Sequence, residues 1–166
     1  MAKELAIFGG SFNPVHLGHL IIAECCLEQA HLDRVLFMPA ATPPHKQNSP
    51  LACPEDRIEM LRLALASHDK LDFSLNECDR GGISYTVDTV SDLVARHPND
   101  RFSLILGPDA LRDLPSWRKP QEILGIVRIL AIERHGIDDI EKTLQEPQLK
   151  ALLSNKQSQQ IKAERI

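Results

Sequence analysis

The sequence predicts an α/β protein in which a parallel β-sheet is covered by helices on both faces. Short apolar runs alternate with longer amphipathic segments through most of the chain. The runs are continuously apolar, as in strands that are buried on both sides of a sheet. A repeated strand–helix order implies parallel strands joined by right-handed crossovers. These observations predict a Rossmann-like, doubly wound sheet, whose ligands bind beyond the carboxyl ends of the strands.

The first two strands are expected at residues 5–8 and 35–38, each an uninterrupted apolar run. The first run ends at Gly9 and Gly10, which break the strand pattern. Between the two strands, apolar residues recur at helical spacing from residue 17 to about residue 31. We therefore expect a strand, a helix and a second strand at the start of the chain.

A loop, a second helix and a short strand follow. Residues 39–50 include four prolines, so this segment cannot be a regular helix or an inner strand. Pro54 suits the first turn of a helix that extends to about residue 67. Residues 71–75 then form a third strand.

The second half of the chain supplies two more strands. A helix is expected to begin near Ser84 or Tyr85, after a pair of glycines. Residues 102–106 and 127–132 are apolar runs and give the fourth and fifth strands. Residues 136–166 contain no strand-like run, and we expect this polar, Gln-rich segment to be helical.

Composition limits the classes of function. The chain has 166 residues, 43% of them hydrophobic and 25% charged, which suits one globular domain. A net charge of −4 argues against a broad nucleic-acid-binding surface but is compatible with a pocket for a small anion. The four cysteines form no Cys-x-x-Cys pair. No apolar stretch approaches the roughly 20 residues that cross a bilayer. We expect a soluble, cytoplasmic protein.

The chemistry is concentrated directly after the first strand. Residues 9–19 read Gly-Gly-Ser-Phe-Asn-Pro-Val-His-Leu-Gly-His. The two glycines let the backbone approach a ligand, and the helix that follows directs free N–H groups and its positive dipole end to the same place. His16 and His19 are three residues apart, so they share one face of the first helical turn. The combination predicts a polyphosphate site.

Each part of this motif also occurs in proteins where it binds nothing. A Gly-Gly pair after a strand is often only a tight turn, and a single histidine is more often a surface or core residue. Two histidines at this spacing also occur in metal sites, but the glutamate of the usual zinc motif is missing, and we assign no metal ligands. The dinucleotide fingerprint Gly-x-Gly-x-x-Gly is absent as well, which argues against a dehydrogenase.

The motif resembles the signature of the nucleotidyltransferase superfamily that carries His-x-Gly-His. The chain is similar, more narrowly, to bacterial nicotinate-nucleotide adenylyltransferases over about residues 1–136. Four further segments support this resemblance: Pro43-Pro44-His45-Lys46, Gly82 to Thr89 with Ser-Tyr-Thr, Gly107-Pro108-Asp109-Ala110, and Leu114 to Arg118 with Pro-x-Trp. The resemblance implies one nucleotidyltransferase domain, residues 1–166, that transfers AMP from ATP to nicotinate mononucleotide and releases pyrophosphate.

The resemblance also assigns roles to residues. It places Gly9, Gly10, Ser11 and Phe12, together with His16 and His19, around the ATP phosphates, and the two histidines are the expected catalytic residues. The remaining expected substrate-binding residues form three pairs. Gly107 and Asp109 are expected to bind the nucleotide sugar, Thr86 and Trp117 the pyridine ring, and Lys46 and Arg134 the phosphates.

Some of these residues would also suit purely structural roles. Asp109 would suit a helix N-cap, Trp117 would suit core packing, and Lys46 and Arg134 would suit the surface. We expect Mg²⁺ as the cofactor, held mainly by ATP oxygens. The expected partners are ATP and nicotinate mononucleotide, without nucleic acid or membrane, and a homo-oligomer is compatible with the sequence.

The C-terminal part departs from the family pattern. Such enzymes continue past the fifth strand into another strand and a Ser/Thr-rich turn that ends in Arg, and no such turn precedes Ile166. The resemblance therefore implies a C-terminal part that is incomplete or divergent. Two other functions stay open: the same transfer onto nicotinamide mononucleotide or another phosphorylated acceptor such as phosphopantetheine, and a non-catalytic nucleotide-binding module.

Overall fold

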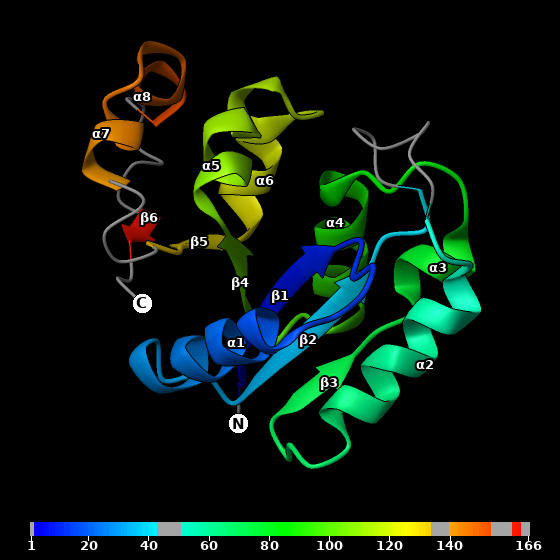
Figure 1. Ribbon diagram of the computed structural model, residues 1–166. Helices are drawn as coiled ribbons and strands as arrows, with labels where there is room; N and C mark the ends of the chain where they lie inside the picture. Colours follow the sequence, from blue (N-terminus) through cyan, green and yellow to red (C-terminus); the bar gives the residue numbers. More distant parts are fainter. Residues whose placement is uncertain (1, 43–50, 134–139, 154–160, 164–166) are drawn as a thin grey trace.

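The computed structural model describes residues 2–42, 51–133, 140–153 and 161–163. Within this part of the chain, six parallel strands form one sheet in the order β3-β2-β1-β4-β5-β6 (Figure 1). The strands are β1 (Glu4–Gly10), β2 (Arg34–Pro39), β3 (Leu71–Phe73), β4 (Arg101–Leu106), β5 (Arg128–Ala131) and β6 (Ile161–Ala163). The predicted Rossmann-like sheet is confirmed.

The chain reverses its direction across the sheet between β1 and β4. It moves outward from β1 to β2 and β3, then returns to place β4 on the free side of β1, where Ile7 lies opposite Leu104. Crossovers leave β1 and β4 in opposite directions, so their carboxyl ends separate and open a crevice. The fold therefore places the ends of these two strands, at Gly10 and Leu106, at the position where such sheets bind ligands.

Helices cover both faces of the sheet (Figure 1). Along β1, Ala6 and Phe8 pack on one face, and Leu5 and Ile7 pack on the other, because successive strand residues point in opposite directions. The first face is covered by α1 (Leu17–Gln29) and α2 (Pro54–Leu65), and the second by α4 (Thr86–Arg96), α5 (Pro108–Asp113), α6 (Pro120–Ile126), α7 (Ile140–Leu144) and α8 (Pro147–Leu153).

Several short elements differ from the sequence-based expectations. The structure adds α3 (Asn76–Arg80) and a 3₁₀ turn, η2 (Leu114–Ser116). The expectation of a helical C-terminal segment is wrong in part, because β6 pairs in parallel with β5 after α8. This strand has only three residues with Lys162 in the middle, so it carries no apolar run and depends on its pairing with β5. None of the described helices is long and apolar enough to span a membrane.

Candidate active site

The turn after β1 is held in shape by an aromatic side chain. Phe12 is 2% exposed and packs against the rings of Phe8 and Phe37, with ring centroids 5.8 and 5.3 Å away. Its backbone has a positive φ of 43°, a conformation that costs on the order of 1–3 kcal/mol and that the buried ring offsets. A Cβ at Gly10 would lie 3.0 Å from the Phe12 ring, so this position has little room for a side chain. The two residues shape the turn together.

The two imidazoles of the motif stack on each other. His16 is the N-cap of α1, and His19 lies in its first turn, with ring centroids 3.7 Å apart and an angle of 29° between the planes. The backbone N–H of His16 donates to Nδ1 of His19 at 3.2 Å. Because Nδ1 accepts, the neutral His19 ring carries its proton on Nε2. A Cβ at Gly18 would lie 3.2 Å from the His16 ring, so Gly18 makes room for this stack.

Burial, and to a smaller extent the neighbouring His16, lower the pKa of His19 from 6.5 to about 4. The imidazolium form is disfavoured because a charge loses hydration there and faces a second ring of the same potential charge. In the free protein at neutral pH, His19 is therefore a neutral donor through Nε2. A bound anion would raise this pKa again, because an opposite charge favours the protonated form.

A cavity of about 600 Å³ lies over the two histidines. Its walls come from the turn after β1, from α1 and from the start of α5 beyond β4, and the predicted residues among them are Gly10, Ser11, Phe12, His16, His19, Gly107 and Asp109. These residues come from segments about 90 positions apart in the chain, and the crevice between β1 and β4 brings them together.

Asp109 lines the same cavity as the two histidines. Its side chain is 84% exposed and pairs with Arg112 at 3.3 Å. The N-cap of α5 is Gly107, so the alternative role of Asp109 as a helix N-cap is wrong. Its carboxylate is free of a capping role and can accept hydrogen bonds from a ligand in the cavity.

A second cavity of about 210 Å³ continues from the first toward α4. It is lined by both Gly9 and Gly107, and a Cβ at either residue would meet nothing within 4 Å, so the backbone is open to a ligand. Glu77 also lines this cavity and is buried, and the Thr89 hydroxyl donates to its Oε1 at 2.7 Å. Glu77 lies in the short helix α3, and no motif in the sequence marks it as a site residue.

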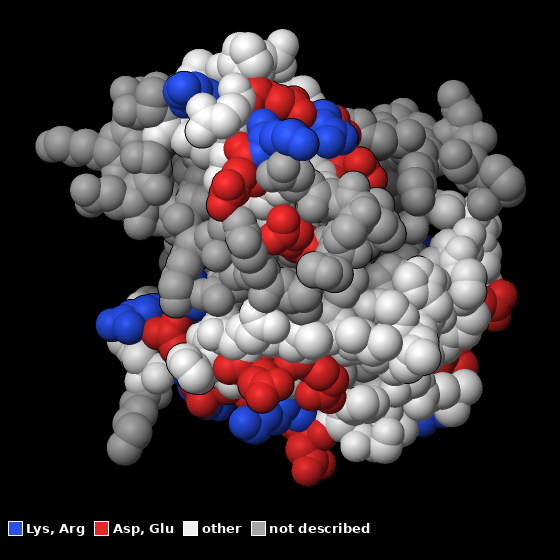
Figure 2. Space-filling model, turned by 60° about the vertical axis from the view of Figure 1, so that its left-hand side comes forward, with Lys and Arg blue, Asp and Glu red and all other residues white. Residues whose placement is uncertain are grey.

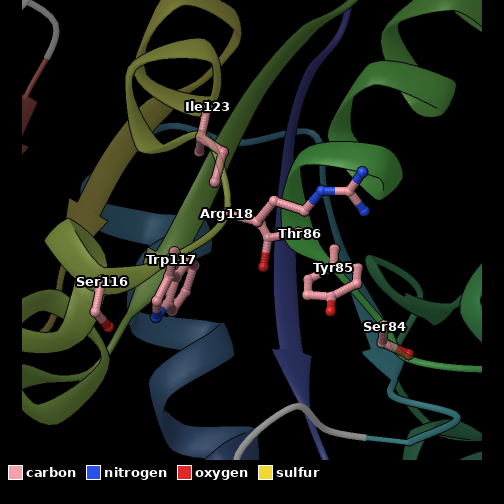
Figure 3. A pocket seen from close by; sticks show the side chains of 7 residues that line it. All are labelled: Ser84, Tyr85, Thr86, Ser116, Trp117, Arg118 and Ile123. Carbon is pink, nitrogen blue, oxygen red and sulfur yellow. The ribbon is translucent and has the colours of Figure 1, made fainter.

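A third cavity of about 140 Å³ contains the predicted pyridine-ring residues (Figure 3). Trp117 lies on one side, and Thr86 and Tyr85 lie on the other at the N-terminus of α4. Trp117 and Thr86 also line the second cavity, so the three cavities follow one another along the carboxyl edge of the sheet. The Arg118 guanidinium lies 4.8 Å above the Tyr85 ring and 3.4 Å from Asp88.

Arg57 is a further residue at the site that sequence reasoning missed. Its side chain is 1% exposed, and its guanidinium donates to the Ser11 carbonyl at 2.8 Å and to the Ala40 carbonyl at 2.9 Å. The sequence gives no signal for this role, because an arginine among the charged residues of α2 is typical of a surface residue.

Two predicted phosphate-binding residues, Lys46 and Arg134, lie outside the described residues. No group of three or more His, Cys, Asp or Glu side chains that could hold a metal ion occurs in the part of the chain that the structure describes. Among the described residues that line the cavity over the histidines, Asp109 is the only carboxylate. The site is therefore compatible with a metal ion that is held mainly by the oxygens of a bound nucleotide.

Comparisons with known proteins identify the family. A family model described as cytidylyltransferase-like matches residues 7–166. The chain is 44% identical over 143 residues to a probable nicotinate-nucleotide adenylyltransferase of Synechococcus sp. (strain JA-2-3B'a(2-13)), covering 86% of this chain and 71% of that protein. It is 45% identical over 134 residues to the nicotinate-nucleotide adenylyltransferase of Bacillus subtilis (strain 168), covering 81% and 71%. It is 41% identical over 133 residues to a probable nicotinate-nucleotide adenylyltransferase of Geobacillus thermodenitrificans (strain NG80-2), and this match covers 80% of this chain and 62% of that protein.

Solved structures share the fold. The nicotinic acid mononucleotide adenylyltransferase of Plasmodium falciparum, solved as a complex with NaAD, superposes with a TM-score of 0.77 at 18% identity, covering 99% of this chain and 75% of that one. A putative nicotinate-nucleotide adenylyltransferase from Vibrio parahaemolyticus gives a TM-score of 0.67 at 21% identity, covering 93% and 94%. The family is assigned from the family model and from the sequence identities to the curated relatives over most of this chain. This chain belongs to the cytidylyltransferase-like family and, within it, to the nicotinate-nucleotide adenylyltransferases.

Proposed function

We propose that this chain transfers AMP from ATP to nicotinate mononucleotide, forming deamido-NAD and pyrophosphate. The observation that carries the proposal is the row of three cavities along one edge of the sheet, with stacked imidazoles at one end and an aromatic slot at the other. A reaction that joins two nucleotides needs both held end to end. The cavity at His16 and His19, with two imidazoles and the N-terminus of α1, suits the triphosphate, and the slot at Trp117 suits a pyridine ring.

The reaction needs no general base. The phosphate of the acceptor is largely ionised at neutral pH, since its second pKa is about 6. One of its oxygens attacks the α-phosphorus of ATP, a new P–O bond forms, and the bond to the β-phosphate oxygen breaks to release pyrophosphate. The protein must therefore hold two anions in line and stabilise the charge that develops on the leaving group.

His19 is proposed to stabilise the leaving pyrophosphate. Its Nε2–H is available as a donor because Nδ1 accepts the His16 backbone N–H. A neutral donor held in place in this way needs no reorganisation as the charge develops. As the leaving group becomes more negative, the hydrogen bond that it accepts from Nε2–H of His19 becomes stronger.

Residues of the turn and of α5 complete the nucleotide site in this proposal. The backbone of Gly9, Gly10, Ser11 and Phe12 supports the phosphates, and Asp109 accepts hydrogen bonds from the sugar hydroxyls. Lys46 and Arg134, for which the structure gives no position, are proposed to add positive charge. Mg²⁺ bound to the phosphate oxygens would neutralise part of the charge on the triphosphate, and the family resemblance implies its use.

We expect the aromatic slot to accept an acid better than an amide, although Arg118 also pairs with Asp88. The slot is lined by Arg118 and by Thr86, the first residue of α4, whose helix dipole favours negative charge at this end. The nicotinate carboxylate would be stabilised by both, whereas the neutral amide of nicotinamide would gain less. The proposal therefore names nicotinate mononucleotide as the preferred acceptor.

The proposed partners are ATP and nicotinate mononucleotide, in the cytoplasm. On the face in Figure 2, basic side chains lie beside acidic ones, and the described residues form no continuous basic area there. The absence of nucleic-acid and membrane binding stays a prediction, as does the single domain over residues 1–166 and any association into a homo-oligomer.

A pyrophosphate-release assay tests the proposal. ATP is supplied with nicotinate mononucleotide, nicotinamide mononucleotide or phosphopantetheine in turn, and we expect product formation to be fastest with the first. A faster reaction with either other acceptor would assign a different adenylyltransferase. Binding of ATP in titration calorimetry, without pyrophosphate from any acceptor, would instead identify a non-catalytic nucleotide-binding module.

A further inference from the structure

The buried arginine of α2 lies behind the turn that the proposed function assigns to the phosphates. Arg57 is 1% exposed. A buried guanidinium is costly unless its N–H groups are paired, because it loses its hydration. In this structure it donates to three backbone carbonyls, those of Ser11, Ala40 and Ala52, at 2.8, 2.9 and 3.3 Å. Arg57 thus connects three segments that are separate in the sequence.

These segments converge at the end of β1. Ser11 follows β1 and Ala40 follows β2, and the Ala40 N–H donates to the Gly10 carbonyl at 2.9 Å. The Asn13 side-chain oxygen, in the same turn, accepts from the Ala52 N–H at 2.9 Å. Hydrogen bonds at Gly10, Ser11 and Asn13 therefore hold the turn in place. The Arg57 side chain contacts all three of the segments that form these bonds.

The contact with Ser11 sets the direction of a peptide group. In a trans peptide, the C=O of one residue and the N–H of the next point in opposite directions. The Ser11 carbonyl points to Arg57 on the buried side, so the N–H of Phe12 in the same peptide group points the other way. Both Ser11 and Phe12 line the cavity over the histidines. A reversed peptide would present a carbonyl oxygen to the phosphates in place of an N–H.

The observed orientation of this peptide group is held against the usual backbone preference of Phe12. Phe12 has a φ of 43°, in the left-handed region that a residue with a side chain rarely adopts. Such a conformation persists where the surroundings fix it. The Phe12 ring is fixed by Phe8 and Phe37, and the carbonyl on the other side of the peptide group is fixed by Arg57.

We propose that Arg57 is a positioning residue for ATP: by holding the Ser11 carbonyl, it keeps the Ser11–Phe12 peptide group turned with its N–H toward the phosphates. The inference rests on the proposed function, in which this turn binds ATP. We therefore expect a change at Arg57 to weaken the binding of ATP much more than binding in the aromatic slot at Trp117. A general structural role would weaken both sites together.

Titration calorimetry on the full chain separates these roles. The dissociation constants for ATP with Mg²⁺ and for nicotinate mononucleotide are measured separately in the wild type, in Arg57→Lys and in Arg57→Ala. Lysine keeps the charge and much of the volume but cannot reach three carbonyls with a planar fork, so it reports on the hydrogen bonds even where the alanine variant does not fold. Arg62→Ala, which removes an exposed arginine of α2 paired with Glu59, is the matched control.

We expect the dissociation constant for ATP to rise about tenfold or more in Arg57→Lys, with that for nicotinate mononucleotide within about twofold, and no change in the control. An unchanged ATP affinity in Arg57→Lys, or equal losses for both ligands, would overturn the positioning role. A wild-type chain that binds no ATP would instead count against the proposed function.

Discussion

His16 holds His19 in a single orientation. The His16 backbone N–H donates to Nδ1 of His19 at 3.2 Å, while the two rings stack with centroids 3.7 Å apart. The first contact leaves Nε2 of His19 as the protonated nitrogen, and the nearby His16 ring adds to the effect of burial in lowering the pKa of His19. The first turn of α1 therefore presents a fixed, neutral donor to the cavity.

Replacement of His19 by alanine removes this donor. We expect His19→Ala to lower kcat by roughly 10²- to 10³-fold, because that is the usual effect of losing one well-placed electrostatic donor. The free energy of unfolding should change by about 1 kcal/mol, since the ring makes one hydrogen bond and is only half-buried. Steady-state kinetics and urea unfolding measure the two effects. His97→Ala, at the opposite end of α4 from Thr86, is the control, and an unchanged kcat in His19→Ala would remove the role of this residue.

Acid should destabilise the protein through His19. The pKa of His19 is lowered from 6.5 to about 4 in the folded state. As the pH falls below 6.5 the unfolded chain takes up a proton that the folded one resists, so stability decreases until about pH 4 and then levels off. Above pH 6.5 both states are neutral and the residue has no effect. Urea midpoints at pH 7 and pH 5 should therefore differ more in the wild type than in His19→Gln, and an equal difference would contradict the lowered pKa.

A methyl group at Gly18 should disturb the histidine stack. A Cβ there would meet the His16 ring at 3.2 Å, so Gly18→Ala is expected to move the imidazole and weaken ATP binding several-fold. Gly125 lies in the helix α6, and a Cβ at this position meets nothing within 4 Å. Gly125→Ala should raise stability by about 0.5–1 kcal/mol without affecting ATP. Calorimetry with ATP compares the two variants, and equal ATP affinities would mean that the stack is not needed.

Replacement of Trp117 should weaken the binding of the acceptor and leave the binding of ATP nearly unchanged. Stacking of a base-like ring on an aromatic side chain contributes on the order of 1–3 kcal/mol, so Trp117→Ala should raise KM for nicotinate mononucleotide about tenfold. KM for ATP should stay within about twofold. Trp117→Phe retains a flat ring and is expected to recover most of the loss. A larger effect on ATP than on the acceptor, or no recovery with phenylalanine, would place the pyridine ring elsewhere.

The strands and the histidine motif were predictable because their signals are local. The run Leu5 to Phe8 is apolar throughout, and the glycines that follow it are adjacent in the sequence to the histidines that share their site. Residues such as Gly107 and Trp117 could be assigned only through the family resemblance, because they are far from the first motif in the sequence. The pairing of β1 with β4 brings them close to it in the fold.

Other features left no trace in the sequence pattern. Arg57 resembles a surface arginine of a charged helix, and only the tertiary structure shows that its partners are carbonyls of distant segments. Strand β6 has three residues and no apolar run, so pairing with β5 decides its conformation. The lowered pKa of His19 depends on its burial beneath neighbouring rings, which residue spacing does not report.

A crystal structure of the chain with a non-hydrolysable ATP analogue tests the proposed phosphate site most directly. We expect the triphosphate in the cavity lined by Ser11 and Asp109, with Nε2 of His19 within hydrogen-bond distance of a phosphate oxygen. A nucleotide bound elsewhere, with this cavity empty or with His16 and His19 turned to opposite sides, would contradict the assignment.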